Sequence, residues 1–253
     1  MKHSAARYSA LLLCCTSVLL SAQSPSEANR PMPPDYRGVQ TYVPGIFITP
    51  IPNAPFTADV EIVSHQKLPN GTENVRTTIN HIARDSAGRI YNERRQFVPA
   101  TFKGEPRLLS AHIYDPNNRL SIFFDPSTRI ARESTLNRPP IAPPNSVPSD
   151  HTPKDPSFQQ NEIGEQSIDG TTLRGIEKLH TLDASSSGTG QPITIADEYW
   201  YSAELSVYLI IKHNDPRTGE QIVAVTHIDR HEPPSVDFAV PANYKLVDET
   251  PPQ

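Results

Sequence analysis

Alternation of apolar and polar residues, broken by Asp-Pro turns, is the feature that most constrains how this chain can fold. Segments 58–63, 109–114 and 120–124 carry an apolar residue at every second position, which is the period of a strand with one buried face. Asp-Pro pairs at 115–116, 125–126 and 215–216 each stand between two alternating segments. Proline presets the first central φ of a type I turn, and the aspartate before it accepts backbone hydrogen bonds. The pattern therefore predicts antiparallel strands joined by tight turns.

The same alternation continues across most of residues 56–250. Asn70-Gly71 and Asp169-Gly170 add further turn signals between alternating segments. No window of about 15 residues carries a capped helical period, and the alternating segments amount to roughly ten strands. We therefore expect a mainly β fold with little helix, built as a curved antiparallel sheet or an open (half) β-barrel.

Residues 1–24 have the layout of a secretory signal peptide. Lys2 and Arg7 precede an apolar run at residues 11–20, and Ala22-Gln23-Ser24 supplies the small residues of a cleavage site. The run is shorter than the about 20 residues that span a bilayer, and no second run of that kind follows. We therefore expect export to the periplasm, the cell envelope or the medium, with no transmembrane span in the mature chain.

Composition narrows the chemistry of the exported chain. Both cysteines, Cys14 and Cys15, lie in the expected signal peptide, so the mature chain would have no disulfide, thiol nucleophile or thiolate metal site. Loss of Lys2 and Arg7 removes two positive charges from a formal net charge of −5, which leaves −7. Because such an acidic chain is poorly suited to bind polyanions, we expect no nucleic-acid partner.

Proline divides the chain into segments. The 27 prolines gather mainly in residues 25–55 and 137–158, and proline is about twice as frequent as the usual 5%. We predict that residues 25–55 form an extended leader that lies against the domain through Tyr42 and residues 46–48. Segment 137–158 is either a linker between two domains or a long excursion within one. The second reading is favoured because each half alone offers only about five strands, so residues 56–250 are expected to form a single β domain with this insertion.

No motif for catalysis or metal binding stands out. The serines at 185–187 form a low-complexity loop, and no G-x-S-x-G elbow is present. His227 and His231 would lie ~13 Å apart on an extended strand, too far for one ion. Asp197 and Glu198 are neighbours on a predicted strand, so they point to opposite faces and are interpreted as exposed strand carboxylates. The sequence therefore predicts no enzyme, no cofactor and no metal site.

Apolarity on both faces of one strand is the positive indication of function. Residues 205–211, LSVYLII, exceed what a half-solvated strand needs. Either both faces of this strand are covered, or one face lines an apolar cavity. His213 and Asp215 follow at the expected strand end, where we predict that they shape the turn. The candidate ligand-binding residues are Trp200, Tyr208, Phe124 and Ile210.

Three motifs give a resemblance to a known family. They are Ile168-Asp169-Gly170, then Trp200-Tyr201 with Leu205, and finally Phe238 with Val240, Pro241 and Tyr244. Over roughly residues 56–247 the chain resembles secreted bacterial proteins with the LolA-like outer-membrane lipoprotein-sorting fold. The resemblance implies a curved antiparallel sheet that wraps an apolar cavity, and it supplies no catalytic residue.

Two functions stay open at this point. The first is an exported cell-envelope binding protein that holds an apolar or acylated ligand in the concave face of a curved sheet. The alternative is a non-catalytic structural or interaction protein of the envelope, whose proline-rich segments bind protein partners. The motifs mark strands and turns, so they do not decide between the two.

Overall fold

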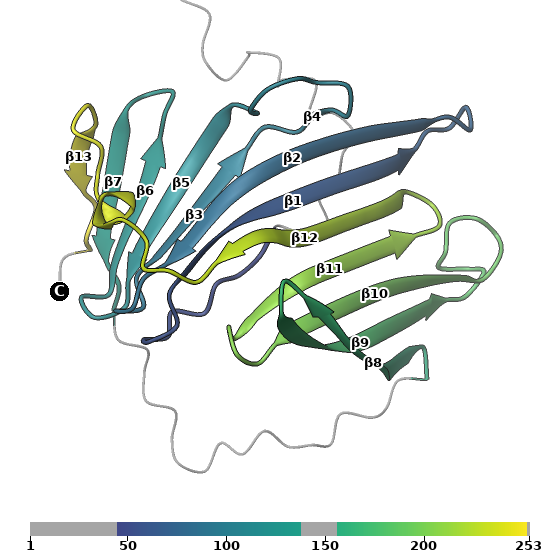
Figure 1. Ribbon diagram of the computed structural model, residues 1–253. Helices are drawn as coiled ribbons and strands as arrows, with labels where there is room; N and C mark the ends of the chain where they lie inside the picture. Colours follow the sequence, from purple (N-terminus) through teal and green to yellow (C-terminus); the bar gives the residue numbers. More distant parts are fainter. Residues whose placement is uncertain (1–44, 138–155, 252–253) are drawn as a thin grey trace, which may run out of the picture.

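A single large sheet dominates the computed structural model, which describes residues 45–137 and 156–251 (Figure 1). Thirteen strands belong to the sheet, and they alternate with short turns. They are β1 (Phe56–Lys67), β2 (Glu73–Arg84), β3 (Ile90–Arg95), β4 (Val98–Pro99), β5 (Leu108–Asp115), β6 (Leu120–Asp125), β7 (Ile130–Thr135), β8 (Phe158–Ile168), β9 (Thr171–Leu182), β10 (Ile193–Ser202), β11 (Val207–Asp215), β12 (Gly219–Asp229) and β13 (Lys245–Asp248). Among the described residues, the 3₁₀ turn η3 (Ser235–Phe238) lies between β12 and β13.

The strand order shows how the two halves of the chain join. It runs β13-β7-β6-β5-β3-β2-β1-β12-β11-β10-β9-β8, with β4 paired to β2. Strands on both sides of segment 137–158 thus share one sheet, and β1 pairs with β12 at the junction. Pairing is antiparallel except between β13 and β7. The predicted mainly β, curved and open sheet is confirmed, although it has more strands than the roughly ten expected, while the boundaries of a single domain stay a prediction.

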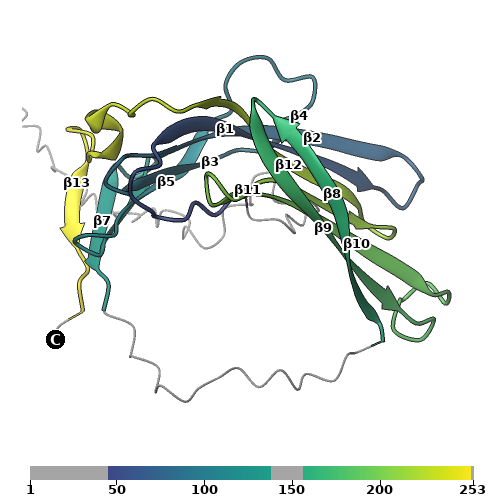
Figure 2. The same ribbon diagram turned by 60° about the horizontal axis from the view of Figure 1, so that its bottom comes forward.

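The sheet curves into an arch with two distinct faces (Figure 2). Strand β1 alternates as predicted, because Val60 and Ile62 are buried while Asp59 and Glu61 are partly exposed. We call the face of Val60 and Ile62 the concave face, and that of Asp59 and Glu61 the outer face. Cross-strand register extends the assignment, because residues directly opposite each other share a face. Ile62, Val223 and Ile211 therefore lie side by side on the concave face.

The Asp-Pro turns form as the sequence predicts. Each aspartate carboxylate accepts the backbone N–H two residues on, at 2.9 Å from Asn117 to Asp115, from Ser127 to Asp125 and from Arg217 to Asp215. Each turn then passes through a residue with positive φ, namely Arg119, Arg129 and Gly219. A side chain would not fit at Gly219, since a Cβ there would lie 1.8 Å from the carbonyl oxygen of His65.

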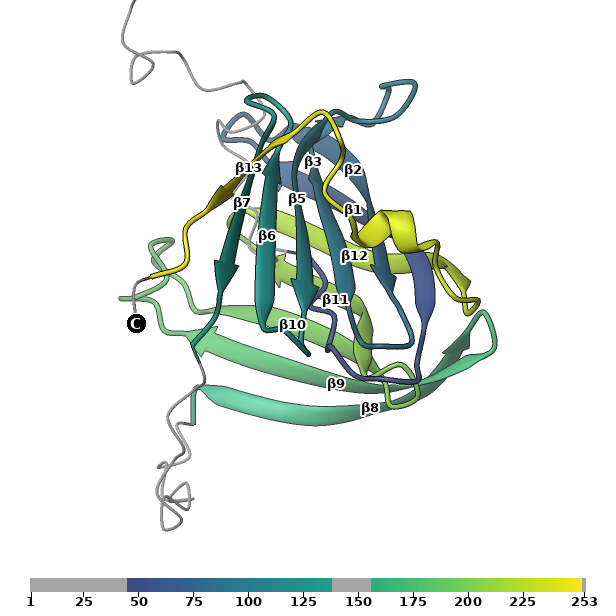
Figure 3. The same cartoon turned by 90° about the vertical axis from the view of Figure 1, so that its left-hand side faces the viewer.

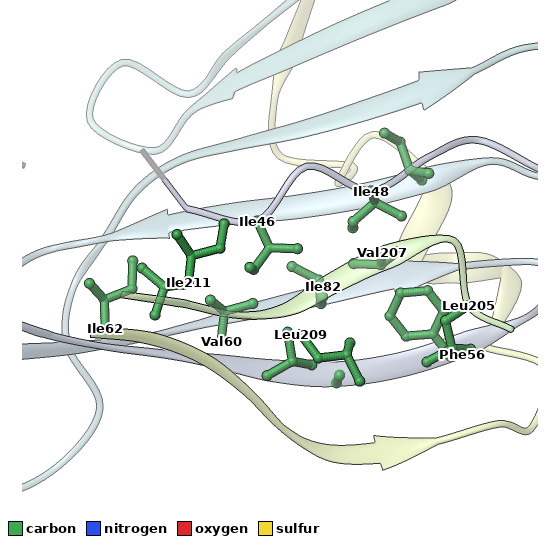
Figure 4. Close-up of a cluster of buried hydrophobic side chains, with 14 of the residues drawn as sticks. Ile46, Ile48, Phe56, Val60, Ile62, Ile82, Leu205, Val207, Leu209 and Ile211 are labelled. Carbon is green, nitrogen blue, oxygen red and sulfur yellow. The ribbon is translucent and has the colours of Figure 1, made fainter. Parts of the chain in front are cut away.

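Chain segments from the two ends of the domain cover the two faces. Residues 45–55 run inside the arch, between the wall of β5–β7 and the wall of β9–β11 (Figure 3). Their side chains Ile46 and Ile48 pack with residues of β1 and β11 in the larger apolar core (Figure 4). Tyr244, which follows η3, packs against Phe124 in a smaller core formed with β5, β6 and β7. Each fully buried aliphatic side chain contributes about 1.5–3 kcal/mol to stability, so both covers contribute to the fold.

The expected signal peptide and leader, residues 1–55, are only partly described by the structure. The expected signal peptide and most of the leader, including Tyr42, lie outside the described residues. Of the three leader residues expected to contact the domain, Ile46 and Ile48 are buried, whereas Phe47 is 76% exposed. In the described part of the chain, no helix has the length and apolarity to cross a bilayer.

Candidate binding surface on the concave face

Apolar side chains from three adjacent strands form the floor of the concave face. Two rows run across β1, β12 and β11: Val60 lies opposite Val225, and Ile62 lies opposite Val223 and then Ile211. All five side chains are at most 9% exposed. Alternation places them on one face of the sheet. These side chains belong to the larger of the two apolar cores in the described residues.

Residues 45–55, which we call the leader cover, close this floor without joining the sheet. They form no strand and are held by a few separate hydrogen bonds. Thr49 Oγ1 donates to the Ser206 carbonyl oxygen at 2.8 Å, and Asn92 Nδ2 donates to the Ile46 carbonyl oxygen at 3.2 Å. The Asn53 N–H donates to the Ser86 carbonyl oxygen at 2.9 Å. The cover is therefore attached by side chains and isolated contacts, not by a ladder.

A buried arginine also holds the leader cover. The fully buried Arg84 donates from Nε to the Ala54 carbonyl oxygen and from Nη1 to the Thr49 carbonyl oxygen, both at 2.8 Å. Its guanidinium carbon lies 4.9 Å from the centroid of the Phe56 ring. Burial lowers the pKa of Arg84 to about 10, because a charge in an apolar site loses its hydration. Backbone carbonyls thus take the place that a carboxylate usually takes beside a buried arginine.

Beyond the apolar floor, the same face becomes polar within one row. The next row across the sheet is Ser64, Gln221, His213 and Asp197, each opposite the next on β1, β12, β11 and β10. His213 Nδ1 and Asp197 Oδ1 lie 2.7 Å apart in a hydrogen bond. The row lines a hollow of about 710 Å³, together with Asp215 and residues of the neighbouring turns. Burying polar side chains costs free energy unless they form hydrogen bonds. Packing of the core alone therefore does not explain why the concave face changes from apolar to polar side chains here.

A second hollow, of about 570 Å³, lies on the outer face beneath η3. Asp59 stands between two histidines there, with Oδ1 at 2.5 Å from His81 Nδ1 and Oδ2 at 3.1 Å from His227 Nδ1. Burial alone would lower the pKa of His81, but hydrogen bonds to Asp59 and Glu105 raise it overall. The backbone of His227 has a positive φ of 53°, at the irregularity where the β1–β12 register shifts.

Two of the predicted ligand-binding residues lie together, but on the outer face. Trp200 is directly opposite Ile210, and Ile210 is opposite Ala224, which is opposite Glu61. The Trp200 ring also covers Gly175, where an added Cβ would come within 2.7 Å of the ring. Trp200 also packs against the larger apolar core that contains Ile46 and Ile48. The part that these two side chains take in lining a ligand site stays a prediction.

Of the other two predicted residues, Tyr208 lies two residues before Ile210 on β11, whereas Phe124 is distant. Tyr208 is 38% exposed and meets Tyr201 and Tyr199 edge to face, with ring centroids 5.1 and 5.8 Å apart. Phe124 lies on β6, which is six strand positions from β11. The Tyr244 ring packs against it edge to face. Of the four residues, Phe124 lines the hollow beneath η3. Their role in binding stays a prediction.

Sequence reasoning missed the polar row of the concave face. We interpreted Asp197 as an exposed strand carboxylate and His213 as a turn residue, yet His213 is 6% exposed and bonded to Asp197 in the sheet. The turn is shaped by Asp215, as predicted. The available signal was the spacing of Leu209, Ile211, His213 and Asp215 at every second position, which places all four on one face.

Comparison with known proteins gives matches of fold. No protein-family model and no curated protein matches the sequence. Similar solved structures include an uncharacterized conserved protein from Thermus thermophilus, with a TM-score of 0.40 and 10% identity over 78% of this chain and 91% of that one. MucB has a TM-score of 0.37 and 10% identity over 77% of this chain and 60% of its own. A LolA superfamily protein from Nitrosomonas europaea has a TM-score of 0.29 and 15% identity over 75% and 91% of the two chains.

The matches agree with the resemblance drawn from the sequence motifs. LolA-like proteins are among the structures that this chain resembles, as the motifs predicted. With TM-scores below 0.5, the likeness extends to the general architecture of a curved sheet and says nothing about what this chain binds.

Proposed function

We propose that this protein is an exported binding protein of the cell envelope that holds an apolar or acylated ligand against the concave face of its sheet. One observation carries the proposal: the apolar floor, which belongs to the larger of the two cores, is covered by a segment that belongs to no strand. A core closed by strands would open only when the protein unfolds. A core closed by the leader cover opens when residues 45–55 leave, while the sheet beneath keeps its hydrogen bonds.

Energetic magnitudes favour a long acyl chain as the competitor of the leader cover. The buried side chains of Ile46 and Ile48 contribute about 3–6 kcal/mol together. Each neutral hydrogen bond of the cover adds about 1 kcal/mol. An acyl chain gains about 0.8 kcal/mol for each buried methylene, so about ten methylenes match the cover and a short chain does not. We therefore expect binding to depend steeply on chain length.

Binding of a fluorescent long-chain fatty acid tests the proposal. The informative variant is Ile46→Ala with Ile48→Ala, which weakens the cover and leaves the floor intact. Phe47→Ala is the matched control, because Phe47 belongs to the same segment and is 76% exposed. We expect saturable binding to the wild type, binding to the double variant that is tighter by about tenfold or more, and no change for Phe47→Ala.

Two further measurements make the result decisive. Urea unfolding establishes that the double variant is folded under the binding conditions. A fluorescent fatty acid of about six carbons should bind at least tenfold more weakly than the long one, following the methylene arithmetic. Absence of saturable binding to both the wild type and the folded double variant would overturn the proposal, as would equal affinity for the two chain lengths.

A further inference from the structure

We infer that the polar hollow at the end of the concave face is a binding site for a neutral carbohydrate. The site goes beyond the proposed function, because it needs neither the apolar floor nor movement of the leader cover. Nothing in the apolar-ligand proposal requires polar side chains at this place. The inference depends on three features: a built row of buried polar groups, balanced charge, and an exposed aromatic ring at the edge.

The built row is the first feature. Ser64, Gln221, His213 and Asp215 are each at most 7% exposed, and all four line the same hollow of about 710 Å³. That volume lies within the about 300–1,000 Å³ of small-molecule sites. Their side chains offer hydroxyl, amide, imidazole and carboxylate groups, which together donate and accept hydrogen bonds. A ligand with many hydroxyl groups, each a donor and an acceptor, matches such a mixed lining.

Charge balance is the second feature, and it selects a neutral ligand. The Asp215 carboxylate receives Arg217 Nη2 at 2.7 Å and Nε at 3.0 Å, and Asp197 is bonded to His213 at 2.7 Å. Neither carboxylate therefore needs a cation from the ligand. The His213 bond occupies one of the about four lone-pair sites of Asp197, so the carboxylate can still accept hydroxyl donors. The lining has three carboxylates, Asp197, Asp215 and Glu220, against two cations, Lys67 and Arg217. A phosphate or carboxylate ligand would therefore meet no excess of positive charge.

The aromatic edge is the third feature. Phe158 is 57% exposed and stacks on His180, with ring centroids 4.0 Å apart and planes 8° apart. Both residues line the hollow beside Ile195, which is opposite His180 across β9 and β10. The C–H groups on one face of a sugar ring are weakly positive, and they pack on the negative face of an aromatic ring. A fixed exposed ring beside buried hydroxyl-binding groups is the arrangement that recognises a sugar.

The chain provides a close internal control for this aromatic edge. Phe123 is 54% exposed and stacks on His112, with centroids 4.1 Å apart and planes 13° apart. This second stack also lines a hollow on the concave face, but that hollow measures only about 160 Å³. That volume is below the about 300–1,000 Å³ of small-molecule sites. The two stacked pairs thus differ mainly in the volume of the hollow beside them.

Calorimetric titration with neutral disaccharides, maltose, cellobiose and chitobiose, tests the site. We expect one of the three to bind the full mature protein saturably. Phe158→Ala should weaken that binding about tenfold, since it removes the stacking face. Asp197→Asn should weaken it as well, because the amide loses one acceptor. Phe123→Ala should leave it unchanged.

A second experiment distinguishes a free saccharide from the sugar headgroup of a glycolipid. The bound disaccharide is compared with an alkyl glycoside of the same sugar, and the wild type with Phe158→Ala and with the Ile46→Ala, Ile48→Ala double variant. A free saccharide as ligand predicts equal affinity for both forms in the double variant. A glycolipid predicts that the alkyl glycoside gains affinity in that variant only.

The outcomes separate this site from the proposed function. Failure of all three disaccharides and their alkyl glycosides to bind the wild type would overturn the carbohydrate site and leave fatty-acid binding untouched. Disaccharide binding that is weakened equally by Phe158→Ala and Phe123→Ala would also overturn it, since the sugar would then not be stacked on Phe158. Fatty-acid binding that is unchanged in Phe158→Ala is expected if the two sites are distinct.

Discussion

The two ends of the domain cover opposite faces of the sheet, and they are attached in different ways. Residues 230–248, which we call the C-terminal segment, cross the outer face and end in β13. The four residues of β13 pair in register with β7. The leader cover crosses the concave face and pairs with no strand. Both segments bury apolar side chains. The C-terminal segment is thus part of the sheet, whereas the leader cover only lies on it.

This difference predicts different cooperativity for the two segments. A strand in register shares its hydrogen bonds with its neighbour, so it opens together with the sheet. A segment held by isolated contacts opens by itself, at a free energy below that of global unfolding. The concave face can therefore be exposed in a folded protein, and the surface beneath the C-terminal segment cannot. The predictions below test this contrast.

The largest effect is expected beneath the C-terminal segment. Phe124→Ala removes a ring that is 5% exposed and packed edge to face on Tyr244, at a centroid distance of 5.7 Å. We expect a loss of about 3–5 kcal/mol in the free energy of unfolding, measured in urea by the fluorescence of Trp200. Phe102→Ala is the control, because Phe102 is 46% exposed and surface changes stay within about 0.5 kcal/mol. A loss below about 1 kcal/mol for Phe124→Ala would contradict a cooperative outer core.

A smaller and more local effect is expected at the clamp of the leader cover. In Arg84→Lys, the single ammonium nitrogen cannot donate to the Thr49 and Ala54 carbonyl oxygens from two fixed positions, as the Arg84 guanidinium does. Hydrogen bonds from a charged donor contribute about 1.5–3 kcal/mol each. In Arg84→Lys we therefore expect faster amide hydrogen exchange in residues 45–55, and unchanged exchange in β13. Equal acceleration in both segments would mean that the leader cover and the sheet open as one unit.

The sequence predicted the architecture well because its signals are local. The alternation in β1 and the aspartates of the three Asp-Pro turns each act within a few residues, and the structure confirms both. The number of strands was underestimated. The two-residue strand β4 and the parallel pairing of β13 arise from contacts with distant strands, which no local period records.

The candidate site was harder to predict, because it depends on which strands become neighbours. Trp200 and Phe124 both looked suitable for a cavity, yet six strand positions separate β6 from the β11 strand beside Trp200. Asp197 and His213 are 16 residues apart in the chain and become partners only through the β10–β11 register. Register is fixed by turns and by the bulge between Trp200 and Tyr201, and a single sequence does not locate such a bulge.

The smallest expected effect is a pH response of opposite sign on the two faces. On the outer face, hydrogen bonds to Asp59 and Glu105 overcome burial and raise the pKa of His81 above 6.5. A raised pKa means that the folded state binds the proton more tightly. Its stabilisation is therefore fully present below pH 6.5 and is lost as the pH rises through the raised value. On the concave face, burial beside the leader cover lowers the pKa of His112 below 6.5. Its contribution is present above pH 6.5 and is lost as the pH falls through the lowered value.

Urea unfolding of His81→Gln and His112→Gln between pH 5 and pH 8 separates these two responses, because glutamine keeps hydrogen-bonding groups but does not titrate. The deficit of His81→Gln relative to wild type should shrink as the pH rises, since the wild type loses its protonated His81. The deficit of His112→Gln should shrink as the pH falls. At low pH the unfolded wild type gains a proton on His112 that the buried folded state takes up less readily, so the wild type loses stability. If the leader cover opens independently, Arg84→Lys should reduce the His112 response, because His112 becomes hydrated, and leave the His81 response unchanged. A His112 response that persists in Arg84→Lys would show that the leader cover does not bury this histidine, and that other parts of the sheet do.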